Sequence, residues 1–412
     1  MSYFKFIRNN LRFLLFGFLL MFFSSFGQTF FISLFNNEIR EFFELTHGNY
    51  GLIYSIATFI SGTIIIWAGK LIDTIDLRNF LLIVSLGLVA GIIILCSSES
   101  IIFLGIAIFL LRLFGQGLMP HTSMTSMTRY YNKDRGKAIS ISSLGLPFGE
   151  VILPVICIYL ISLIGWKLTW ISALIIVIFS IIPIRFYLLK NHSSRHRNWE
   201  LQNNSISDIQ SKKQNKNFTR AEVLLDKKFY FIIFSILSPA YIMTGLFFHQ
   251  IHLFEIKGWS LNLLAGTFAF YALITVSSSI IIGKLIDSYG SKKLVIFHLI
   301  PLSIGLLILS KSINPYAALL YLGLAGVTVG MANSLLSSLW AEIYGTKYIG
   351  SIKSLVTASM VYASALSPFM FGWAIDFGIN IELIILFCMV YTLLSSVTLW
   401  IIFGLKVSKL NA

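Results

Sequence analysis

Long apolar runs separated by short polar stretches dominate the chain from residue 12 to residue 404. Each run holds about twenty residues, which as a helix rising about 1.5 Å per residue crosses a hydrocarbon core of roughly 30 Å. The runs do not alternate polar and apolar positions, as the strands of a transmembrane barrel would. The pattern predicts an all-α integral membrane protein with twelve transmembrane helices, at residues 12–36, 49–72, 79–98, 101–129, 137–164, 168–189, 229–254, 261–286, 292–310, 315–341, 348–374 and 380–404.

One longer polar interval, residues 190–228, interrupts this pattern. Apolar residues are sparse in it and basic residues are frequent, which is typical of a linker. The interval predicts an amino-terminal six-helix bundle at residues 1–189, a cytoplasmic linker at 190–228 and a carboxy-terminal six-helix bundle at 229–412.

The two blocks repeat one another. The stretch GKLID at Gly69–Asp73 recurs 214 positions later at Gly283–Asp287, and at the same offset Pro154 falls on Pro368. An offset one residue shorter places Tyr131 on Tyr344. Several separated matches at nearly one offset indicate an internal duplication, which predicts two bundles related by a pseudo-two-fold axis along the membrane normal.

Composition supports the membrane assignment, because 57% of the residues are hydrophobic and 12% charged, whereas soluble domains have roughly 45–50% and 25%. Of the 31 Lys and Arg, 26 fall on the side of the two termini; the others are Arg112 inside the membrane and Arg40, Lys167, Lys257 and Lys311 on the opposite side. This bias predicts cytoplasmic termini in a cell inner membrane, with the first span retained. It also explains the net charge of +14 without nucleic acid.

The same sequence gives little support for an enzyme. It has no phosphate-binding loop of the form G-x-x-x-x-G-K-[ST], and no nucleophile with a positioned base. The three cysteines lack the spacing of a metal site or of a disulfide framework. We therefore expect no metal and no cofactor, and we expect an ion gradient to supply the energy for any transport.

The duplicated stretch resembles the signature of the major facilitator superfamily, G-x-x-x-D-x-x-G followed by basic residues between the second and third helices. The second copy fits it with Gly283, Asp287, Gly290, Lys292 and Lys293; the first copy keeps Gly69, Asp73 and Arg78 but has Asp76 at the second glycine. The resemblance covers essentially the whole chain. It implies two six-helix bundles that alternate around a central site, with these residues forming a cytoplasmic gate.

Two ionisable residues lie at membrane depth, where such groups are functional candidates by default. By helix rise, Arg112 lies about 16 Å and Glu150 about 22 Å below the outer membrane face, so we expect them to pair. Arg112, with Gly115 and Gly117, resembles the basic motif of the superfamily's fourth helix, which is often tied to proton coupling. In that interpretation Glu150 exchanges the proton; in the alternative, the pair only fixes helix packing.

Other polar residues in the spans supply weaker candidates. His249 and His252 share a helix face and would sense protons or contact an anion, or else belong to the interfacial aromatic belt. His121 follows Pro120 and falls opposite Arg112 if the fourth helix is regular. Neutral hydrogen-bonding side chains are expected to line a central cavity at Gln28, Tyr54, Tyr271, Thr275, Asn333 and Tyr362.

Substrate class is less closely defined. The passages YYNKDRGKAISISSLG and FFHQIHLFEIKGWS look like the monocarboxylate porter and oxalate:formate antiporter branch, although that branch's charges on helix eight are absent. Gly136, Gly145 and Gly149 reproduce part of the antiporter motif of helix five, with Glu150 in place of its proline. We therefore predict a monomeric secondary transporter that moves a small organic anion or zwitterion by proton symport. The alternatives are a drug:proton antiporter for efflux and a solute sensor that does not transport.

Overall fold

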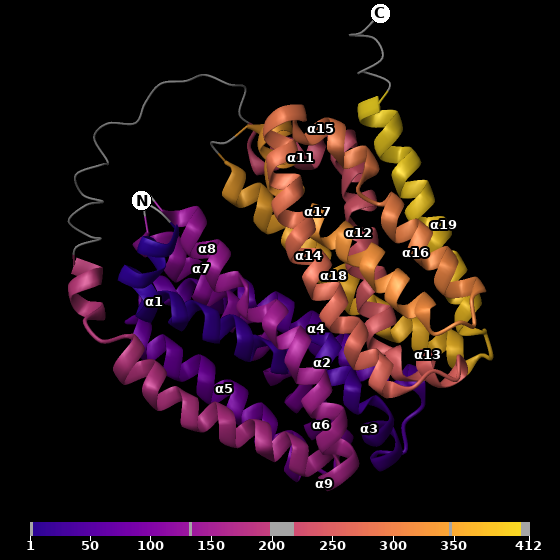
Figure 1. Ribbon diagram of the computed structural model, residues 1–412, viewed down its shortest axis with the longest axis horizontal. Coiled ribbons are helices and arrows are strands. Elements are labelled where there is room, and N and C mark those ends of the chain that lie inside the picture. The colour runs from indigo at the N-terminus through magenta and orange to yellow at the C-terminus, as the bar shows by residue number, and fades with distance from the viewer. Residues whose placement is uncertain (1–2, 132–133, 198–217, 346–347, 405–412) are drawn as a thin grey trace, which may run out of the picture. The chain divides into compact units, whose positions relative to one another are not determined.

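A computed structural model describes residues 3–131, 134–197, 218–345 and 348–404, which form helices joined by short connections (Figure 1). Within these residues, eleven helical stretches are long and apolar enough to cross a membrane. One of them, Arg135–Leu188, covers two predicted spans, because its helix α9 (Gly145–Pro183) turns at Gly165, where the backbone adopts φ 76° and ψ 169°. The all-α membrane fold is confirmed, and the count agrees with twelve spans once this turn is recognised.

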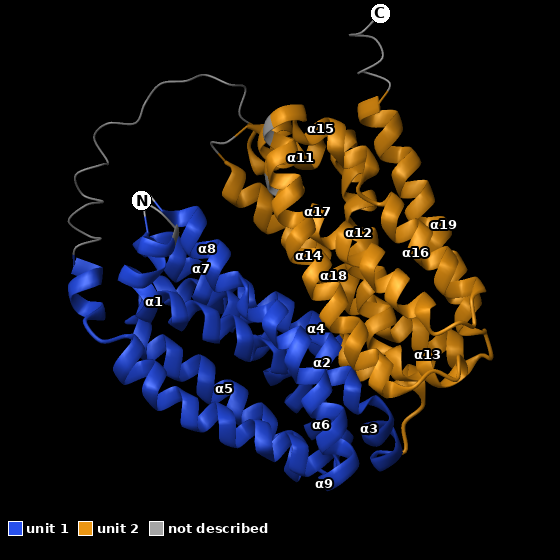
Figure 2. Cartoon of the chain, in the orientation of Figure 1, with its two compact units in different colours: residues 1–43, 56–213 blue, residues 44–55, 214–412 orange. Residues whose placement is uncertain are grey.

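The chain forms two compact units (Figure 2). Unit 1 comprises residues 1–43 and 56–213, and unit 2 comprises residues 44–55 and 214–412. Residues 44–55 differ from the predicted division, because the sequence placed them in the amino-terminal bundle at 1–189 and the structure groups them with unit 2. The expected linker at 190–228 falls largely on residues 198–217, which lie outside the described residues.

Unit 1 begins with a first membrane helix that is broken into short pieces. In order, these pieces are α1 (Tyr3–Phe23), η1 (Ser24–Gly27), α2 (Thr29–Ile32), η2 (Ser33–Phe35) and α3 (Asn36–Phe42). The chain continues through α4 (His47–Ala68), of which residues 47–55 belong to unit 2 and the rest to unit 1. The elements after it are η3 (Gly69–Asp73), α5 (Leu77–Ser97), α6 (Ile101–Leu110), η4 (Leu111–Leu118), α7 (Met119–Tyr130), α8 (Arg135–Ser143), α9 and η5 (Ile184–Leu188). The segment η4 is a π-helix that joins α6 to α7.

Unit 2 follows the same plan with fewer interruptions. Its elements are α11 (Arg220–Leu225), α12 (Lys227–Phe248), α13 (Gln250–Ile256), α14 (Leu261–Tyr289), α15 (Ser291–Leu294), η6 (Val295–Phe297), α16 (Ile300–Lys311), α17 (Tyr316–Tyr344), α18 (Ile349–Asp376), α19 (Ile381–Leu399) and η7 (Trp400–Gly404). Its first membrane helix is also interrupted, at His249 between α12 and α13.

Side-chain caps explain where several helices begin. The Asp76 carboxylate accepts a hydrogen bond from the Arg78 N–H at the start of α5, and Asp226 does the same for Lys228 at the start of α12. Each cap satisfies one of the backbone donors that a helix start leaves unpaired. The outward faces of both units expose large apolar side chains, including Trp67, Ile102 and Phe387, as expected for helices in contact with lipid.

Candidate functional site

The break in the first helix is the main polar feature buried in unit 1. After Gly27 the backbone extends at Gln28, with φ −80° and ψ 150°, and helix resumes at Thr29. Ser24, Ser25, Ser33 and Asn36 are buried around this break, and Gln28 is half-buried. Irregular backbone at membrane depth is tolerated only where protein or a water-filled cavity surrounds it, and such breaks form substrate sites in many transporters.

Arg112 binds this break directly. Its side chain is only 3% exposed, and Nη1 donates hydrogen bonds to the Gly27 carbonyl oxygen at 3.0 Å and to Thr29 Oγ1 at 3.3 Å. The guanidinium thus satisfies a carbonyl that the interrupted helix would otherwise leave unpaired. Arg112 belongs to the π-helical segment η4, and such segments occur frequently at functional sites.

The expected ion pair between Arg112 and Glu150 is wrong. Among the described residues no ion pair involves Glu150, which is half-buried on α9. Depth along the membrane, the basis of that prediction, does not fix the direction in which a side chain points, and the π-helix turns Arg112 toward the first helix. The adjacent Gly149 packs against the break, because a Cβ on Gly149 would overlap Ser25 Oγ.

Glycines allow the helices of unit 1 to meet at the break. A Cβ on Gly27 would lie within 2.8 Å of backbone atoms of Leu111, Gln116 and Gly115. A Cβ on Gly145 would overlap the Phe18 carbonyl oxygen. The close contact between the first and fourth helices therefore requires glycine at position 27, and the fifth helix packs on the first through Gly145 and Gly149.

His121 lies elsewhere in unit 1. Its Nε2 is 2.9 Å from the Gly69 carbonyl oxygen, so this residue contacts the duplicated motif. The condition of a regular fourth helix is not met, because Arg112 lies in the π-helical segment η4, which ends at Leu118 before His121. His121 is thus a partner of the predicted gate in unit 1.

The first copy of the duplicated motif is held by an ion pair. Arg129, at the end of α7, pairs with the Asp73 carboxylate and donates from Nη1 to the Ile72 carbonyl oxygen at 3.1 Å. Arg78 pairs instead with Asp76, at 3.1 Å from Nε to Oδ1. Asp76 adopts φ −53° and caps α5, so this copy makes its turn without the second glycine.

The second copy uses different contacts. Gly290 adopts φ 77°, a conformation that favours glycine, and Ser291 N donates to Glu342 Oε1 at 2.8 Å. Lys292 Nζ donates to the Glu342 carbonyl oxygen at 3.0 Å, and Lys293 is exposed. No described atom outside the local backbone lies within 4 Å of a Cβ placed on Gly283, so no close contact between described residues requires glycine at this position. The side chain of Asp287 lies outside the described part.

The remaining candidates lie in unit 2. Tyr54 is buried and its ring lies 4.6 Å from that of Phe248, while Tyr271 is buried with its ring 5.8 Å from that of Phe247. Thr275 donates to the Tyr271 carbonyl oxygen within its own helix. Tyr362 is half-buried and Asn333 is exposed.

Sequence reasoning missed a histidine cluster in unit 2. The ring of His47 lies 4.4 Å from that of His252 and 5.7 Å from that of His249, centroid to centroid. His249 is buried, with Nε2 3.0 Å from the Pro368 carbonyl oxygen, so it is no belt residue exposed to lipid. The Asp376 carboxylate accepts hydrogen bonds from His47 N at 3.1 Å and Gly48 N at 2.7 Å. In the part of the chain that the structure describes, no group of three or more His, Cys, Asp or Glu is arranged to hold a metal ion.

A helical membrane protein with a broken first helix, a buried arginine on that break and a duplicated gate-like motif has features of a membrane transporter. The chain belongs to the major facilitator superfamily, whose family model matches residues 17–368. This is a family of transporters that bind small molecules and reside in lipid bilayers.

Comparison with solved structures agrees on the fold. The crystal structure of a bacterial homolog of the human lysosomal transporter Spinster, in an inward-facing and occupied conformation, is similar with a TM-score of 0.65. The sequences are 15% identical, and the match covers 94% of this chain and 95% of the other. No curated protein matches the sequence. The monocarboxylate and oxalate branch is not confirmed by these comparisons.

Proposed function

We propose that this transporter moves a small organic anion or zwitterion, such as a monocarboxylate, inward by proton symport. In this proposal it acts as a monomer in the cell inner membrane, with both termini in the cytoplasm. The observation that carries the proposal is the buried Arg112 side chain bound to the break of the first helix.

Arg112 is suited to a carboxylate ligand. A guanidinium presents five N–H donors in a planar fork, which pairs with a carboxylate through two parallel hydrogen bonds. The buried serines around the break, Ser24 and Ser25, would supply neutral hydrogen bonds to the rest of a small polar substrate.

Glu150 is our candidate for the proton-binding group. It follows Gly149, which packs on Ser25 beside the same break. An ionisable side chain at membrane depth is costly to keep unless function requires it. We propose that Arg112 binds the substrate carboxylate and that Glu150 is protonated when the substrate occupies Arg112.

Ligand-induced thermal stabilisation of the detergent-purified protein tests the binding part of the proposal. A library of small acids, amino acids and lipophilic cations is screened at about pH 5.5 and about pH 7.5, because a ligand of the folded state raises the melting temperature. We expect stabilisation by carboxylates that is stronger at the lower pH. Stabilisation by lipophilic cations alone would overturn uptake of anions and favour drug:proton efflux.

Substitution of Arg112 by Gln is expected to abolish the carboxylate response. The matched control is Lys257→Gln, which removes a different buried cation, one that is 7% exposed. This control is expected to lower the baseline melting temperature and to keep the carboxylate response. If Arg112→Gln responds to carboxylates as the wild type does, Arg112 is not the anion site.

Transport in proteoliposomes tests the coupling. Glu150→Gln is expected to keep exchange of internal for external substrate while losing uptake driven by an imposed proton gradient. Gradient-driven uptake at the wild-type rate in Glu150→Gln would exclude Glu150 as the proton carrier.

A further inference from the structure

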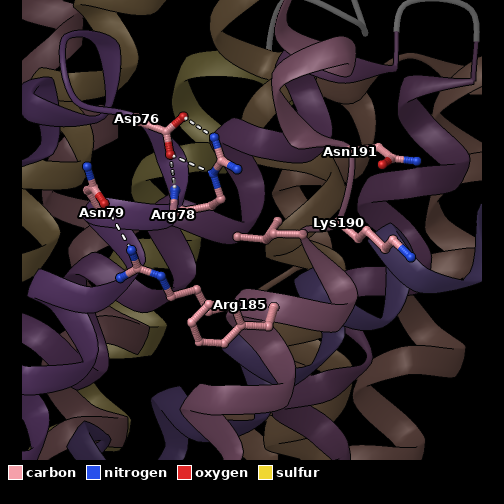
Figure 3. Close-up of a pocket in the computed structure, with 8 residues that line it drawn as sticks. Asp76, Arg78, Asn79, Arg185, Lys190 and Asn191 are labelled. Carbon is pink, nitrogen blue, oxygen red and sulfur yellow. Dashed lines mark hydrogen bonds and ion pairs between the residues drawn. The ribbon is translucent and has the colours of Figure 1, made fainter.

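A polar pocket of about 570 Å³ opens in unit 1, away from the broken helix (Figure 3). The start of α5 and the end of the sixth membrane helix form it, and its lining residues are Asp76, Arg78, Asn79, Arg185, Phe186, Leu189, Lys190 and Asn191. Arg78 belongs to the predicted gate, but neither that gate nor the proposed substrate site accounts for the other two cations, Arg185 and Lys190.

The pocket lining contains more positively charged side chains than negatively charged ones. Asp76 is the single acidic residue in the lining, and it is paired with Arg78. Arg185 Nη2 donates to Asn79 Oδ1, a neutral acceptor, at 3.3 Å, and Lys190 also lines the pocket (Figure 3). Within the described residues neither Arg185 nor Lys190 has a carboxylate partner. The lining therefore carries a net charge of about +2 at neutral pH.

The Asp76 carboxylate stays ionised although it is partly buried. Burial alone would raise the pKa of Asp76, but hydrogen bonds from the Arg78 side chain and backbone, together with the Arg78 charge, hold that pKa below its usual value. The Arg78 guanidinium also donates from Nη2 to Ser193 Oγ at 2.8 Å. Asp76 thus offsets part of the positive charge that Arg78 presents to the pocket.

The depth of the pocket matches the lipid headgroups. It lies where one membrane span, Leu77–Ser97, begins and another, Arg135–Leu188, ends. Phe186 and Tyr187, at the end of that second span, are 69% and 62% exposed, as aromatic residues at a membrane interface are. Arg12 of the first helix donates to the Tyr187 carbonyl oxygen at 2.8 Å, so the pocket lies on the side of the amino terminus, which the basic-residue bias predicts to be cytoplasmic.

We propose that this pocket binds the phosphate group of an anionic phospholipid headgroup, with Arg185 and Arg78 as its main ligands and Lys190 as a further cation. Arginine forks match the geometry of phosphate oxygens. Basic pockets at the cytoplasmic ends of membrane helices provide such headgroup sites. A soluble phosphate shares the chemistry, but the exposed aromatic side chains beside the pocket favour the lipid as its source.

The test measures thermal stabilisation of the full-length protein in neutral detergent by short-chain phosphatidylglycerol, phosphatidylcholine and inorganic phosphate. Both lipids carry the phosphate, but phosphatidylcholine adds a cationic choline that the positively charged lining repels. We therefore expect phosphatidylglycerol to act at a concentration about ten-fold lower than phosphatidylcholine. Inorganic phosphate is expected to have little effect. Equal effects of the two lipids, or an effect of phosphate that matches phosphatidylglycerol, would overturn the lipid site.

Two substitutions should move the response in opposite directions. Arg185→Gln is expected to abolish the preference for phosphatidylglycerol, whereas Asp76→Asn, which keeps a capping side chain but removes the competing charge, should strengthen binding about three- to ten-fold. The control is the double variant Lys227→Gln and Lys228→Gln, which removes two exposed cations from the start of α12. If this control loses the preference as fully as Arg185→Gln, the attraction is to a general basic surface and the pocket is not the site.

Discussion

Substitution of Gly27 by Ala tests whether the broken first helix is held in place by its contact with η4. A Cβ at this position would lie within 2.8 Å of backbone atoms of Leu111, Gln116 and Gly115. Real Cβ atoms essentially never approach other atoms under 3.0 Å, and backbone atoms cannot rotate away as a flexible side chain can. The first and fourth helices must therefore separate in the variant.

The expected cost follows from the packing of that contact. Overfilling a well-packed interior typically costs about 1–3 kcal/mol, and we expect the upper end because the clash involves backbone on both sides. For a unit of this size, about 3 kcal/mol corresponds to a fall in melting temperature of roughly 6–12 °C. The Gly27 carbonyl accepts the Arg112 hydrogen bond, so the variant should also lose the carboxylate response.

The matched control is Gly266→Ala in α14, where no described atom lies within 4 Å of the added Cβ. Alanine in a helix interior is favoured over glycine by about 0.5–1 kcal/mol, so this control should melt at or slightly above the wild-type temperature. Both variants are measured by thermal unfolding in the same detergent. A wild-type melting temperature and carboxylate response in Gly27→Ala would refute the packing of the break against η4.

Three further predictions concern ion pairs and a buried imidazole. Lys257→Gln breaks the 3.2 Å pair with Glu382 and the contact with the Ser312 carbonyl oxygen. The Lys257 side chain is 4% exposed and that of Glu382 33%, so the loss of these partners should cost about 1–3 kcal/mol in thermal unfolding. An unchanged melting temperature would show that the pair is dispensable. Asp73→Asn breaks the pair with Arg129, but the Asp73 side chain is 63% exposed. The free energy of unfolding should therefore change by about 1 kcal/mol or less, while the initial transport rate should fall. A transport rate equal to that of the wild type would exclude a gating role for Asp73. Burial lowers the pKa of His192 to about 4, from an ordinary value near 6.5. The stability that the neutral imidazole contributes to the folded state is therefore fully present above about pH 6.5 and is lost as the pH falls toward 4, by up to about 3 kcal/mol. His192→Gln should make the melting temperature less dependent on pH between about 6.5 and 4.5, and a pH profile equal to that of the wild type would contradict the lowered pKa of His192.

The membrane spans could be predicted from the sequence because their signal is local. A run of about twenty apolar residues makes a membrane helix whatever lies beside it, and the predicted boundaries agree with the structure to within a few residues for spans such as 261–286 and 380–404. The break of the first helix was not predicted, because hydropathy over residues 12–36 is the same for a continuous helix and an interrupted one. The small polar run Ser24–Thr29 was the available signal.

The partners of Arg112 could not be predicted, because they depend on how three helices pack. Counting residues along a regular helix gave its depth and placed it near Glu150. The π-helical segment η4 changes the direction of every side chain within it, and the glycine contact at Gly27 brings a backbone carbonyl within reach of the guanidinium. The histidine cluster was missed for a similar reason, since His47 is some 200 residues from its ring partners His249 and His252.

The duplicated motif shows what an internal repeat can and cannot predict. At the offset of 213 that relates Tyr131 to Tyr344, Arg129 corresponds to Glu342, so equivalent positions carry opposite charges. Arg129 binds the Asp73 carboxylate and the Ile72 carbonyl oxygen, where a helical segment ends, whereas Glu342 accepts the Ser291 N–H, where the next helix begins. A cation suits the carbonyls of a helix end and a carboxylate suits the N–H groups of a helix start. Arg129 and Glu342 therefore each tie the end of one membrane helix to the equivalent loop of its own copy, but with opposite charges. The repeat predicts where this contact lies. Its bonding partners depend on whether the side chain reaches the helix end that precedes the loop or the helix start that follows it.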